Sequence, residues 1–245
     1  MEPVINECAL AIMIKTPQAG VSKTRLVPPL SHEEAAALSV SFLRDTARNI
    51  SATCALQPST GVAAYTPVGS EAALHELLPA NFQLLPQRGN NFGERLRYAT
   101  EDLLNSGYQS VCLIDSDSPT LPSSFLESAV KALGRPGDRV VLGAANDGGY
   151  YLIGLKANHP EVFEEIEWST AKVLDQTVER ARAANLEVQL LPAWYDVDDA
   201  QSLIRLCEEL FSMNDECRAP HTRAYLQGLL QNGGRKSIWP TQQTR

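Results

Sequence analysis

The sequence is short of the residues that build disulfide frameworks and zinc sites. Its 245 residues include five cysteines, an odd number, and four histidines, and no two cysteines form a C-x-x-C arrangement. A disulfide framework needs cysteines that can all be paired, and a structural zinc ion needs clustered cysteine or histidine ligands. The composition therefore argues against both.

Long apolar runs are also missing. The apolar run nearest the N-terminus, Ala9–Ile14, is ended by Lys15. It is too short to cross a membrane and lacks the layout of a signal peptide. We therefore expect a protein without a membrane span, located in the cytoplasm.

Positive charge is scarce as well. Lysine and arginine number 21 against 29 aspartates and glutamates, which gives a net charge of −8 and an isoelectric point near 5.1. Proteins that bind nucleic acids usually present a basic face, so we expect no nucleic-acid partner. A local basic cleft can still attract an anionic ligand in an acidic protein.

The sequence does contain a regular alternation of strand and helix patterns, which predicts an α/β fold. We expect a three-layer α/β/α arrangement with a mostly parallel central sheet and helices on both faces. The short turn at Gly148 and Gly149 predicts one antiparallel return, and Ser31 with Glu34 forms a capping box at a helix start. The expected strands are Cys8–Ile14, Gly61–Tyr65, Phe82–Leu85, the run leading into Asp115, Arg139–Gly143, Tyr150–Leu155 and Glu187–Leu191. The expected helices end near Ile50, Leu78, Asn105, Leu133, Ala184, Phe211 and Leu230.

No linker divides this pattern into independent parts. We therefore expect one domain over residues 1–231. Residues 232–245 are polar and punctuated by glycine and proline, which predicts a disordered tail.

Two carboxylates, Asp115 and Asp117, follow an apolar strand in the stretch V-C-L-I-D-S-D-S-P-T-L. Ligands of open α/β sheets bind at the carboxyl ends of the strands. Oxygen ligands suit a hard divalent cation, which in turn binds phosphate oxygens. One interpretation is therefore a metal site. The alternative is a loop in which these residues cap the helix that begins near Pro122.

The loop after the first strand concentrates positive charge. Lys15, Lys23 and Arg25 lie within eleven residues of one another in an otherwise acidic chain. Gly20 permits close backbone approach, and Thr24 supplies a hydroxyl. Such a loop can hold phosphates by charge and through backbone N–H groups, although it is not a Walker A sequence. The alternative is a solvated basic turn.

A second glycine-containing loop follows the third expected strand. Gln87 could pair with the edge of a nucleobase, and Gly89 and Gly93 would permit close approach of a ligand. The alternative is loop architecture, in which Glu94 favourably occupies the start of a helix.

Three further segments carry candidate residues. Asp147 could accept hydrogen bonds from hydroxyl groups of a sugar or acceptor, with Gly148 and Gly149 leaving room beside a strand edge. The alternative for this segment is an ordinary D-G-G turn. Trp168 could form the wall of a pocket. The remaining predictions are that Ser169 or Thr170 caps a helix, and that Asp198 either caps the last-but-one helix or completes a metal site.

Five of these six segments come directly after a predicted strand. Because the carboxyl ends of parallel strands lie at one edge of a sheet, the fold would bring the segments to one rim. This convergence is the main physical argument for a phosphate and metal site.

Taken together, the segments resemble the nucleotide-diphospho-sugar transferase superfamily, which has the GT-A fold. More narrowly, they look like a bacterial glycosyltransferase family associated with arsenosugar biosynthesis or radical-SAM gene clusters. The resemblance spans about Leu10 to Leu206 and includes G-E-R, D-x-P-x-L, D-G-G-Y-Y-L-I-G-L, W-S-T and D-V-D. The K-x-P-x-x-G-x-x-K-T-R-L motif is matched by Lys15, Pro17, Gly20, Lys23, Thr24, Arg25 and Leu26.

The resemblance implies a transferase that uses Mg²⁺ or Mn²⁺. It supports Asp117 as a metal ligand. Family members often have glycine where this chain has Asp115, so the assignment of Asp115 as a second ligand rests on its spacing alone. Asp198 is a candidate second ligand. The implied roles of the other residues are phosphate binding for Lys15, Gly20, Lys23, Thr24 and Arg25; nucleotide binding for Gln87, Gly89 and Gly93; catalysis for Asp147 with Lys23 and Arg25; and an acceptor side formed by Gly148, Gly149, Tyr150, Trp168, Ser169 and Thr170.

The superfamily contains two chemistries. A glycosyltransferase moves a sugar from a nucleotide sugar to a small-molecule acceptor, and a nucleotidylyltransferase uses a nucleoside triphosphate. The K-T-R-L loop also resembles that of phospholactate guanylyltransferase, and its three cations suit a triphosphate. The family resemblance favours glycosyl transfer, which is our first expectation. A hypothesis of another class is a nucleotide-binding regulator without turnover.

Overall fold

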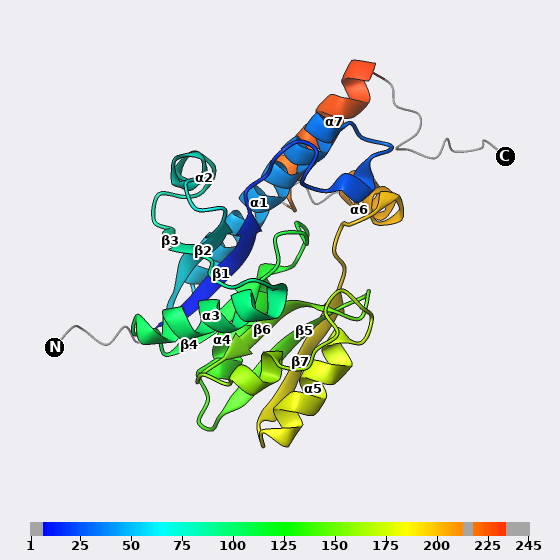
Figure 1. Cartoon of the computed structure of the whole chain (residues 1–245). Coiled ribbons are helices and arrows are strands. Elements are labelled where there is room, and N and C mark those ends of the chain that lie inside the picture. Colours follow the sequence, from blue (N-terminus) through cyan, green and yellow to red (C-terminus); the bar gives the residue numbers. More distant parts are fainter. Residues whose placement is uncertain (1–6, 213–217, 234–245) are drawn as a thin grey trace. The chain divides into compact units, whose positions relative to one another are not determined.

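The computed structural model describes residues 7–212 and 218–233 (Figure 1). Contacts within the chain divide it into two compact units. The sheet unit contains the described residues up to Thr16 together with Ala47–Asp115 and Leu121–Tyr195. The helical unit contains Pro17–Thr46, Ser116–Thr120 and the described residues from Asp196 onward. The single domain expected over residues 1–231 stays a prediction.

The sheet unit is built on a seven-stranded sheet with the order β3-β2-β1-β4-β6-β5-β7. Only β6 runs antiparallel to its neighbours, β4 and β5, and the other pairings are parallel. The mostly parallel sheet and the single antiparallel return are therefore confirmed. The strands are β1 (Cys8–Lys15), β2 (Ser59–Thr66), β3 (Gln83–Pro86), β4 (Ser110–Ile114), β5 (Arg139–Ala145), β6 (Tyr150–Leu155) and β7 (Glu187–Trp194).

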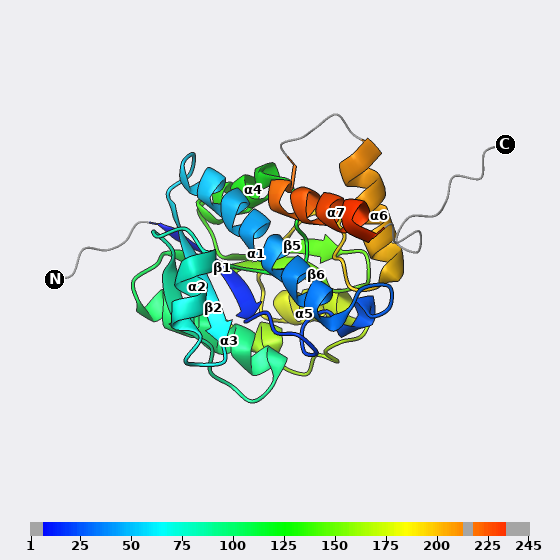
Figure 2. The ribbon, with the colours of Figure 1, turned by 90° about the horizontal axis from the view of Figure 1, so that it is seen from above.

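One face of the sheet packs against α4 (Ser123–Leu133). Cys112, Gly154 and Val141 are register partners on β4, β6 and β5. A Cβ added to Gly154 would lie 3.0 Å from the side chain of Leu133 and close to its two partners. Figure 2 views the molecule from above, with α4 on the upper side of the strands in the picture and α3 and α5 on the lower side. The glycine lets this helix pack closely onto the strands.

The opposite face packs against α3 (Phe92–Asn105) and α5 (Val173–Ala183). The next register row, Leu113, Ile153 and Leu142, points to this face because neighbouring strand residues alternate. The row belongs to one buried core with Leu96 of α3 and Ala181 of α5. Helices therefore cover both faces, and the predicted α/β/α arrangement is confirmed within this unit. The unit also contains α2 (Glu71–Leu77) and the 3₁₀ helix η2 (Pro160–Phe163).

The carboxyl ends of the parallel strands define one edge of the sheet. Lys15 ends β1, Gln87 follows β3, Asp115 follows β4, and Asp147 lies in the turn after β5. Since these strands are parallel to one another, the four residues lie at the same edge, as the sequence predicted. The sheet order reverses direction at β1 and β4, the position where α/β sheets bind ligands.

The helical unit contains the 3₁₀ helix η1 (Thr24–Leu26), α6 (Ala200–Ser212), α7 (Pro220–Gly233) and the start of α1 (His32–Cys54). The capping box is confirmed, because the backbone N–H of Glu34 donates to Ser31 Oγ and that of Ser31 donates to Glu34 Oε2. Asp45 of α1 is buried and accepts from the first N–H groups of α7.

The C-terminal tail was predicted to begin at residue 232. Instead, α7 continues through Gly233, and residues 234–245 lie outside the described part of the chain. Cys217 also lies outside it. Within the described ranges, no helix is both long enough and apolar enough for a transmembrane segment.

Candidate active site

Three residues from distant parts of the sequence form an ion cluster in the helical unit. The Nζ atom of Lys23 lies 2.9 Å from Asp117 Oδ1 and 2.6 Å from Asp198 Oδ1. It also donates to the backbone oxygen of Val197 at 2.8 Å. An ammonium group has three hydrogens, so these partners engage all of them. Lys23 therefore joins the two carboxylates that the sequence proposed as metal ligands.

The cluster is buried on the lysine side and open on the carboxylate side. The side chain of Lys23 is 6% exposed, whereas those of Asp117 and Asp198 are 34% and 43% exposed. Burial alone would lower the pKa of Lys23, but the charges and hydrogen bonds of the two aspartates outweigh it and raise that pKa. Lys23 therefore stays protonated, and its positive charge balances one of the two carboxylates.

Local backbone structure brings the cluster together. Lys23 adopts a left-handed conformation with φ of 51°, which is unusual for a residue other than glycine. The N–H of Val197 donates to the backbone oxygen of Asp117 at 2.9 Å, which ties the segments that carry the two carboxylates. Asp199 caps α6 by accepting from Ser202 N. The alternative in which Asp198 caps this helix is wrong, because its neighbour does so.

The rest of the basic loop is exposed. Gly20 has φ of +75°, and no heavy atom lies within 4 Å of the position that a Cβ would take. Thr24 and Arg25 are exposed on η1. Hydrogen bonds from Ser202 lower the pKa of Asp199, and the charge of Arg25 contributes to the same shift. The open space at Gly20 is compatible with ligand approach.

Two charged residues stand at the carboxyl edge of the sheet unit. Lys15 is exposed, and no ion pair joins it to another residue within the described ranges. Asp115 donates its backbone N–H to the oxygen of Tyr151. Burial raises the pKa of the Tyr151 hydroxyl, and the negative charge of Asp115 adds to this shift. That hydroxyl donates to the backbone oxygen of Pro192 at 3.0 Å.

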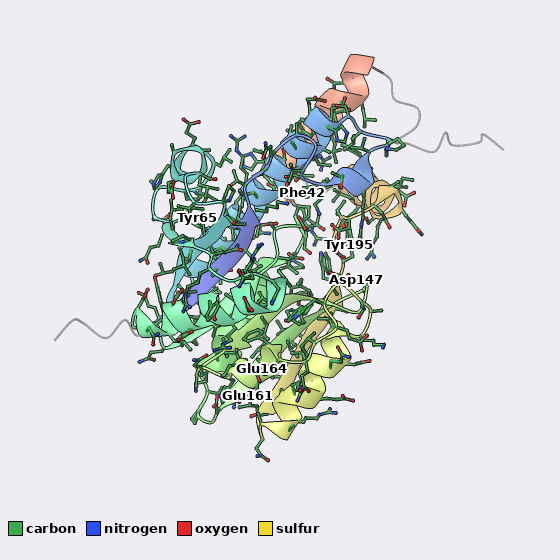
Figure 3. All side chains as sticks on the ribbon, in the orientation of Figure 1. Phe42, Tyr65, Asp147, Glu161, Glu164 and Tyr195 are labelled. Carbon is green, nitrogen blue, oxygen red and sulfur yellow. The ribbon has the colours of Figure 1, made fainter. Side chains whose placement is uncertain are left out.

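Asp147 lies exposed in the turn between β5 and β6 (Figure 3). Its Oδ1 accepts from the N–H of Gly149 at 2.8 Å, so the turn uses one of its two carboxylate oxygens. The predicted ligand space at Gly148 is occupied by the protein itself. A Cβ there would lie 2.3 Å from the backbone oxygen of Ala171, and Gly148 accepts from the N–H of Leu174. This glycine is required by packing of the turn against the following loop.

Residues of the loop after β3 also make contacts within the protein. The side-chain amide of Gln87 donates to the oxygens of Ile14 and Ala64, so it joins β1 and β2. Gly89 has φ of +114°, and a Cβ there would lie 2.8 Å from that of Glu94. The alternative of loop architecture is therefore supported at both positions, and only the carbonyl oxygen of Gln87 is left to a ligand.

Trp168 fills the space beside the second glycine of that loop. A Cβ on Gly93 would lie 2.5 Å from Trp168 Nε1. The indole also makes edge contacts with Phe92 and Tyr150, at ring-centroid distances of 5.3 and 6.5 Å. The tryptophan thus joins the start of α3 to the hairpin.

The prediction that Ser169 or Thr170 caps the next helix is wrong. The helix α5 begins at Val173, and its N-cap is Lys172, whose side chain makes no capping bond. Ser169 has φ of +64°. Thr170 instead closes a turn, donating to the oxygen of Glu167 and accepting from the N–H of Lys172. Both residues are exposed.

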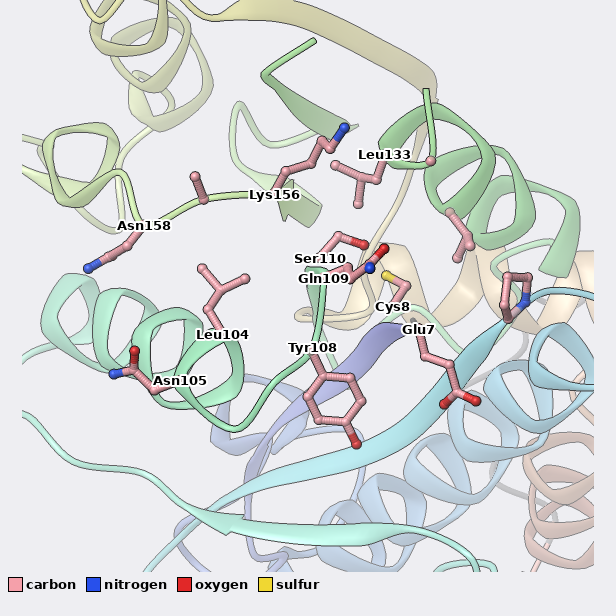
Figure 4. Close-up of a pocket in the computed structure, with 14 residues that line it drawn as sticks. Glu7, Cys8, Leu104, Asn105, Tyr108, Gln109, Ser110, Leu133, Lys156 and Asn158 are labelled. Atoms are coloured by element: carbon pink, nitrogen blue, oxygen red, sulfur yellow. The ribbon is translucent and has the colours of Figure 1, made fainter. Parts of the chain in front are cut away.

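A cavity of about 570 Å³ lies elsewhere on the sheet unit (Figure 4). Its lining includes Cys8 and Ser110, the first residues of β1 and β4. It therefore opens at the amino edge of the sheet, opposite the carboxyl ends. The ammonium group of Lys156, which also lines it, is held by the oxygens of Arg135 and Gly137.

The donor set at Asp117 and Asp198 fits a divalent cation. Within residues 7–212 and 218–233, no three acidic, cysteine or histidine side chains form a group that could hold a metal. Magnesium is commonly held by one or two carboxylates, with water and substrate phosphates completing its octahedron. The ammonium of Lys23 shows that the pair already accepts a cation at hydrogen-bond distance.

Sequence reasoning placed Lys23 on a phosphate and missed its pairing with two aspartates. The residue lies 174 positions from Val197, so no local pattern indicates the contact. The available signal was chemical: one segment rich in lysine and two rich in aspartate follow strands of the same sheet.

The family model described as an uncharacterized protein conserved in bacteria, DUF2064, matches residues 49–170. Among curated proteins, none matches this sequence. A solved structure from Desulfovibrio desulfuricans G20, whose name proposes a nucleotide-diphospho-sugar transferase, is 30% identical. Its TM-score is 0.81, and the match covers 91% of this chain and 95% of that one.

More distant solved structures share the fold. CMP:2-keto-3-deoxy-manno-octonic acid synthetase, complexed with CTP, is 10% identical with a TM-score of 0.52, and the match covers 84% of this chain and 99% of that one. A cytidylyltransferase from Leptospira borgpetersenii is 10% identical with a TM-score of 0.53, over 98% and 99% of the two chains. The predicted resemblance to the nucleotide-diphospho-sugar transferase superfamily is confirmed.

Proposed function

We propose that this chain, which belongs to the DUF2064 family of bacterial proteins, is a metal-dependent glycosyltransferase. It would move a sugar from a nucleoside-diphosphate sugar to a small-molecule acceptor. The observation that carries the proposal is the carboxylate pair Asp117 and Asp198, partly open to solvent and already holding a cationic group. The 30% identical relative, whose name proposes the same class of enzyme, supports it.

The carboxylate pair would hold Mg²⁺ or Mn²⁺ through oxygens that face solvent. When bound, the ion neutralises the charge that develops on a departing nucleoside diphosphate. Asp117 and Asp198 would fix its position, and the hydrogen bond from Val197 to Asp117 would keep the two segments in register. Asp115 stays a proposed ligand at the carboxyl edge of the sheet, where its backbone N–H donates to the oxygen of Tyr151.

The exposed part of the basic loop would bind the diphosphate. Arg25 offers a planar set of donors to phosphate oxygens, and Gly20 and Thr24 add backbone N–H groups and a hydroxyl. Lys15 would supply a further charge from the end of β1. Because the hydrogens of Lys23 are fully engaged, we assign it no phosphate contact.

Asp147 would act on the acceptor. One of its carboxylate oxygens is used by the turn, and the other could accept a hydrogen bond from an acceptor hydroxyl and orient it. Gly149, Tyr150, Trp168, Ser169 and Thr170 remain the proposed acceptor side, with Trp168 acting mainly by packing.

The second candidate function is nucleotidylyl transfer from a nucleoside triphosphate. The exposed cations Lys15 and Arg25 favour it, since neither forms an ion pair within the described residues. The pairing of Lys23 with two aspartates weakens the case for a triphosphate. Only Lys15 and Arg25 are then left for the phosphates, and two cations are no more than a diphosphate needs.

Binding to a panel of nucleotide sugars and nucleoside triphosphates tests the proposal. Each ligand is added with Mg²⁺, Mn²⁺ or EDTA, and thermal unfolding is followed. A ligand at 100 times its Kd stabilises the folded state by about 2.7 kcal/mol. We expect a metal-dependent shift with one nucleotide sugar that is lost in Asp117→Ala. A shift with a triphosphate alone favours the second candidate, and a bound nucleotide that no acceptor consumes favours a regulator.

A further inference from the structure

A buried positive charge, that of Lys23, contacts both carboxylates of the proposed metal pair, Asp117 and Asp198. Lys23 Nζ contacts one oxygen of Asp117 and one of Asp198, and its side chain is only 6% exposed. The two carboxylates are about a third or more exposed. A cation that arrives from solvent therefore meets the carboxylates first, with the ammonium group directly behind them.

Several contacts keep the ammonium group in this position. Its three hydrogen bonds use all its donors, and the third partner is the backbone oxygen of Val197. The ring of Phe42 lies 5.8 Å from Nζ. The left-handed backbone of Lys23 is strained, so the contacts that it permits must offset this strain.

The charge of Lys23 has opposite effects on two forms of the metal. A free divalent cation at the pair would be repelled by the adjacent ammonium. A divalent cation already bound to the diphosphate of a nucleotide sugar is close to neutral as a complex, because the diphosphate carries two negative charges. The same lysine therefore disfavours the free ion far more than the ion bound to phosphate.

We propose, resting on the proposed function, that Lys23 is a positioning residue that pairs Asp117 with Asp198 and suppresses their binding of free metal. The divalent cation then enters together with the nucleotide donor. This order of binding protects the site from occupation by metal alone. It also explains why the lysine of the K-T-R-L motif is buried instead of facing a phosphate.

Titration with Mn²⁺ alone, without nucleotide, tests the inference. Free Mn²⁺ is measured by electron paramagnetic resonance in wild type, Lys23→Met and Lys23→Arg. We expect Lys23→Met to bind Mn²⁺ at least about tenfold more tightly, because it removes the repelling charge while keeping the apolar stem. Lys23→Arg keeps the charge and should bind about as weakly as wild type. Arg44→Met, which removes an exposed cation from α1 in the same unit, should change the affinity less than about twofold.

An unchanged or weaker Mn²⁺ affinity in Lys23→Met overturns the inference. Should that variant not fold, as judged by circular dichroism, the Lys23 ammonium resonance of wild type is followed by ¹⁵N NMR during Mg²⁺ titration. We expect it to stay in place at millimolar Mg²⁺, and displacement by the free ion overturns the inference.

Asp117→Asn separates this inference from the proposed function. If Asp117→Asn abolishes Mn²⁺ binding but Lys23→Met leaves it unchanged, the metal pair stands and only the role of Lys23 fails. If Asp117→Asn leaves Mn²⁺ binding unchanged in the Lys23→Met background, where the repelling charge is gone, the proposed metal pair itself is wrong.

Discussion

Replacing Lys23 by Met should reverse the sign of a second substitution, Asp198→Asn. In wild type, Asp198 Oδ1 accepts a charged hydrogen bond at 2.6 Å, so its loss should destabilise the fold. In the Lys23→Met background, Asp117 and Asp198 face each other without a counter-charge. Removing one of the two negative charges should then relieve repulsion and stabilise the fold.

The magnitude follows from burial. Hydrogen bonds to charged groups contribute roughly 1.5–3 kcal/mol each, but the aspartates are 34% and 43% exposed and can be rehydrated. We therefore expect Lys23→Met alone to cost about 2 kcal/mol in free energy of unfolding. The coupling between the two substitutions should be about 1 kcal/mol or more, as in other contacting charge pairs.

Urea unfolding of wild type, both single variants and the double variant measures this coupling. EDTA is present throughout, so that no metal replaces the lysine. If Asp198→Asn has the same effect in both backgrounds, Lys23 and Asp198 are not coupled and the cluster does not exist in solution as described.

Three further predictions concern other parts of the fold. Gly93→Ala should destabilise the protein by about 1–3 kcal/mol, because its Cβ would overlap Trp168; thermal unfolding measures this, and a neutral result would return Gly93 to the ligand-contact set. Asp45→Ala should cost about 1–2 kcal/mol by uncapping α7, and hydrogen exchange should quicken in that helix first. Burial alone would lower the pKa of His159, but its bonds to Glu161 and Asp138 outweigh this and raise it. Its contribution to stability is therefore complete below about pH 6.5 and is lost as pH rises through the folded-state pKa; His159→Asn should flatten this part of the pH profile of urea midpoints, and an unchanged profile would contradict the pairing.

The architecture could be predicted because local patterns agree with it. Apolar strand runs, the capping box at Ser31 and Glu34, and the D-G-G turn each act over a few residues. The parallel topology then follows from their order, and it correctly placed Asp115 and Asp147 at the carboxyl edge.

Details of the site could not be predicted in this way. Gly93 and Gly148 lie in glycine-containing segments that are typical of ligand-binding loops. The position that a Cβ would take at each is instead filled by Trp168 and Ala171, respectively. Lys23 was assigned to phosphate because a basic loop attracts anions, whereas its nearest anions are the protein's own carboxylates. Both outcomes depend on tertiary packing between segments far apart in sequence, which periodicity and local spacing do not encode.

Identification of the nucleotide product that the enzyme forms from its donor tests the central claim most directly. The full chain is incubated with the nucleotide sugar that stabilises it, Mn²⁺ and a panel of small hydroxyl acceptors, and products are followed by ³¹P NMR. We predict release of a nucleoside diphosphate that stops in EDTA and in Asp117→Ala. Formation of pyrophosphate from a nucleoside triphosphate, or diphosphate release that survives in Asp117→Ala, would contradict a metal-dependent glycosyl transfer at this carboxylate pair.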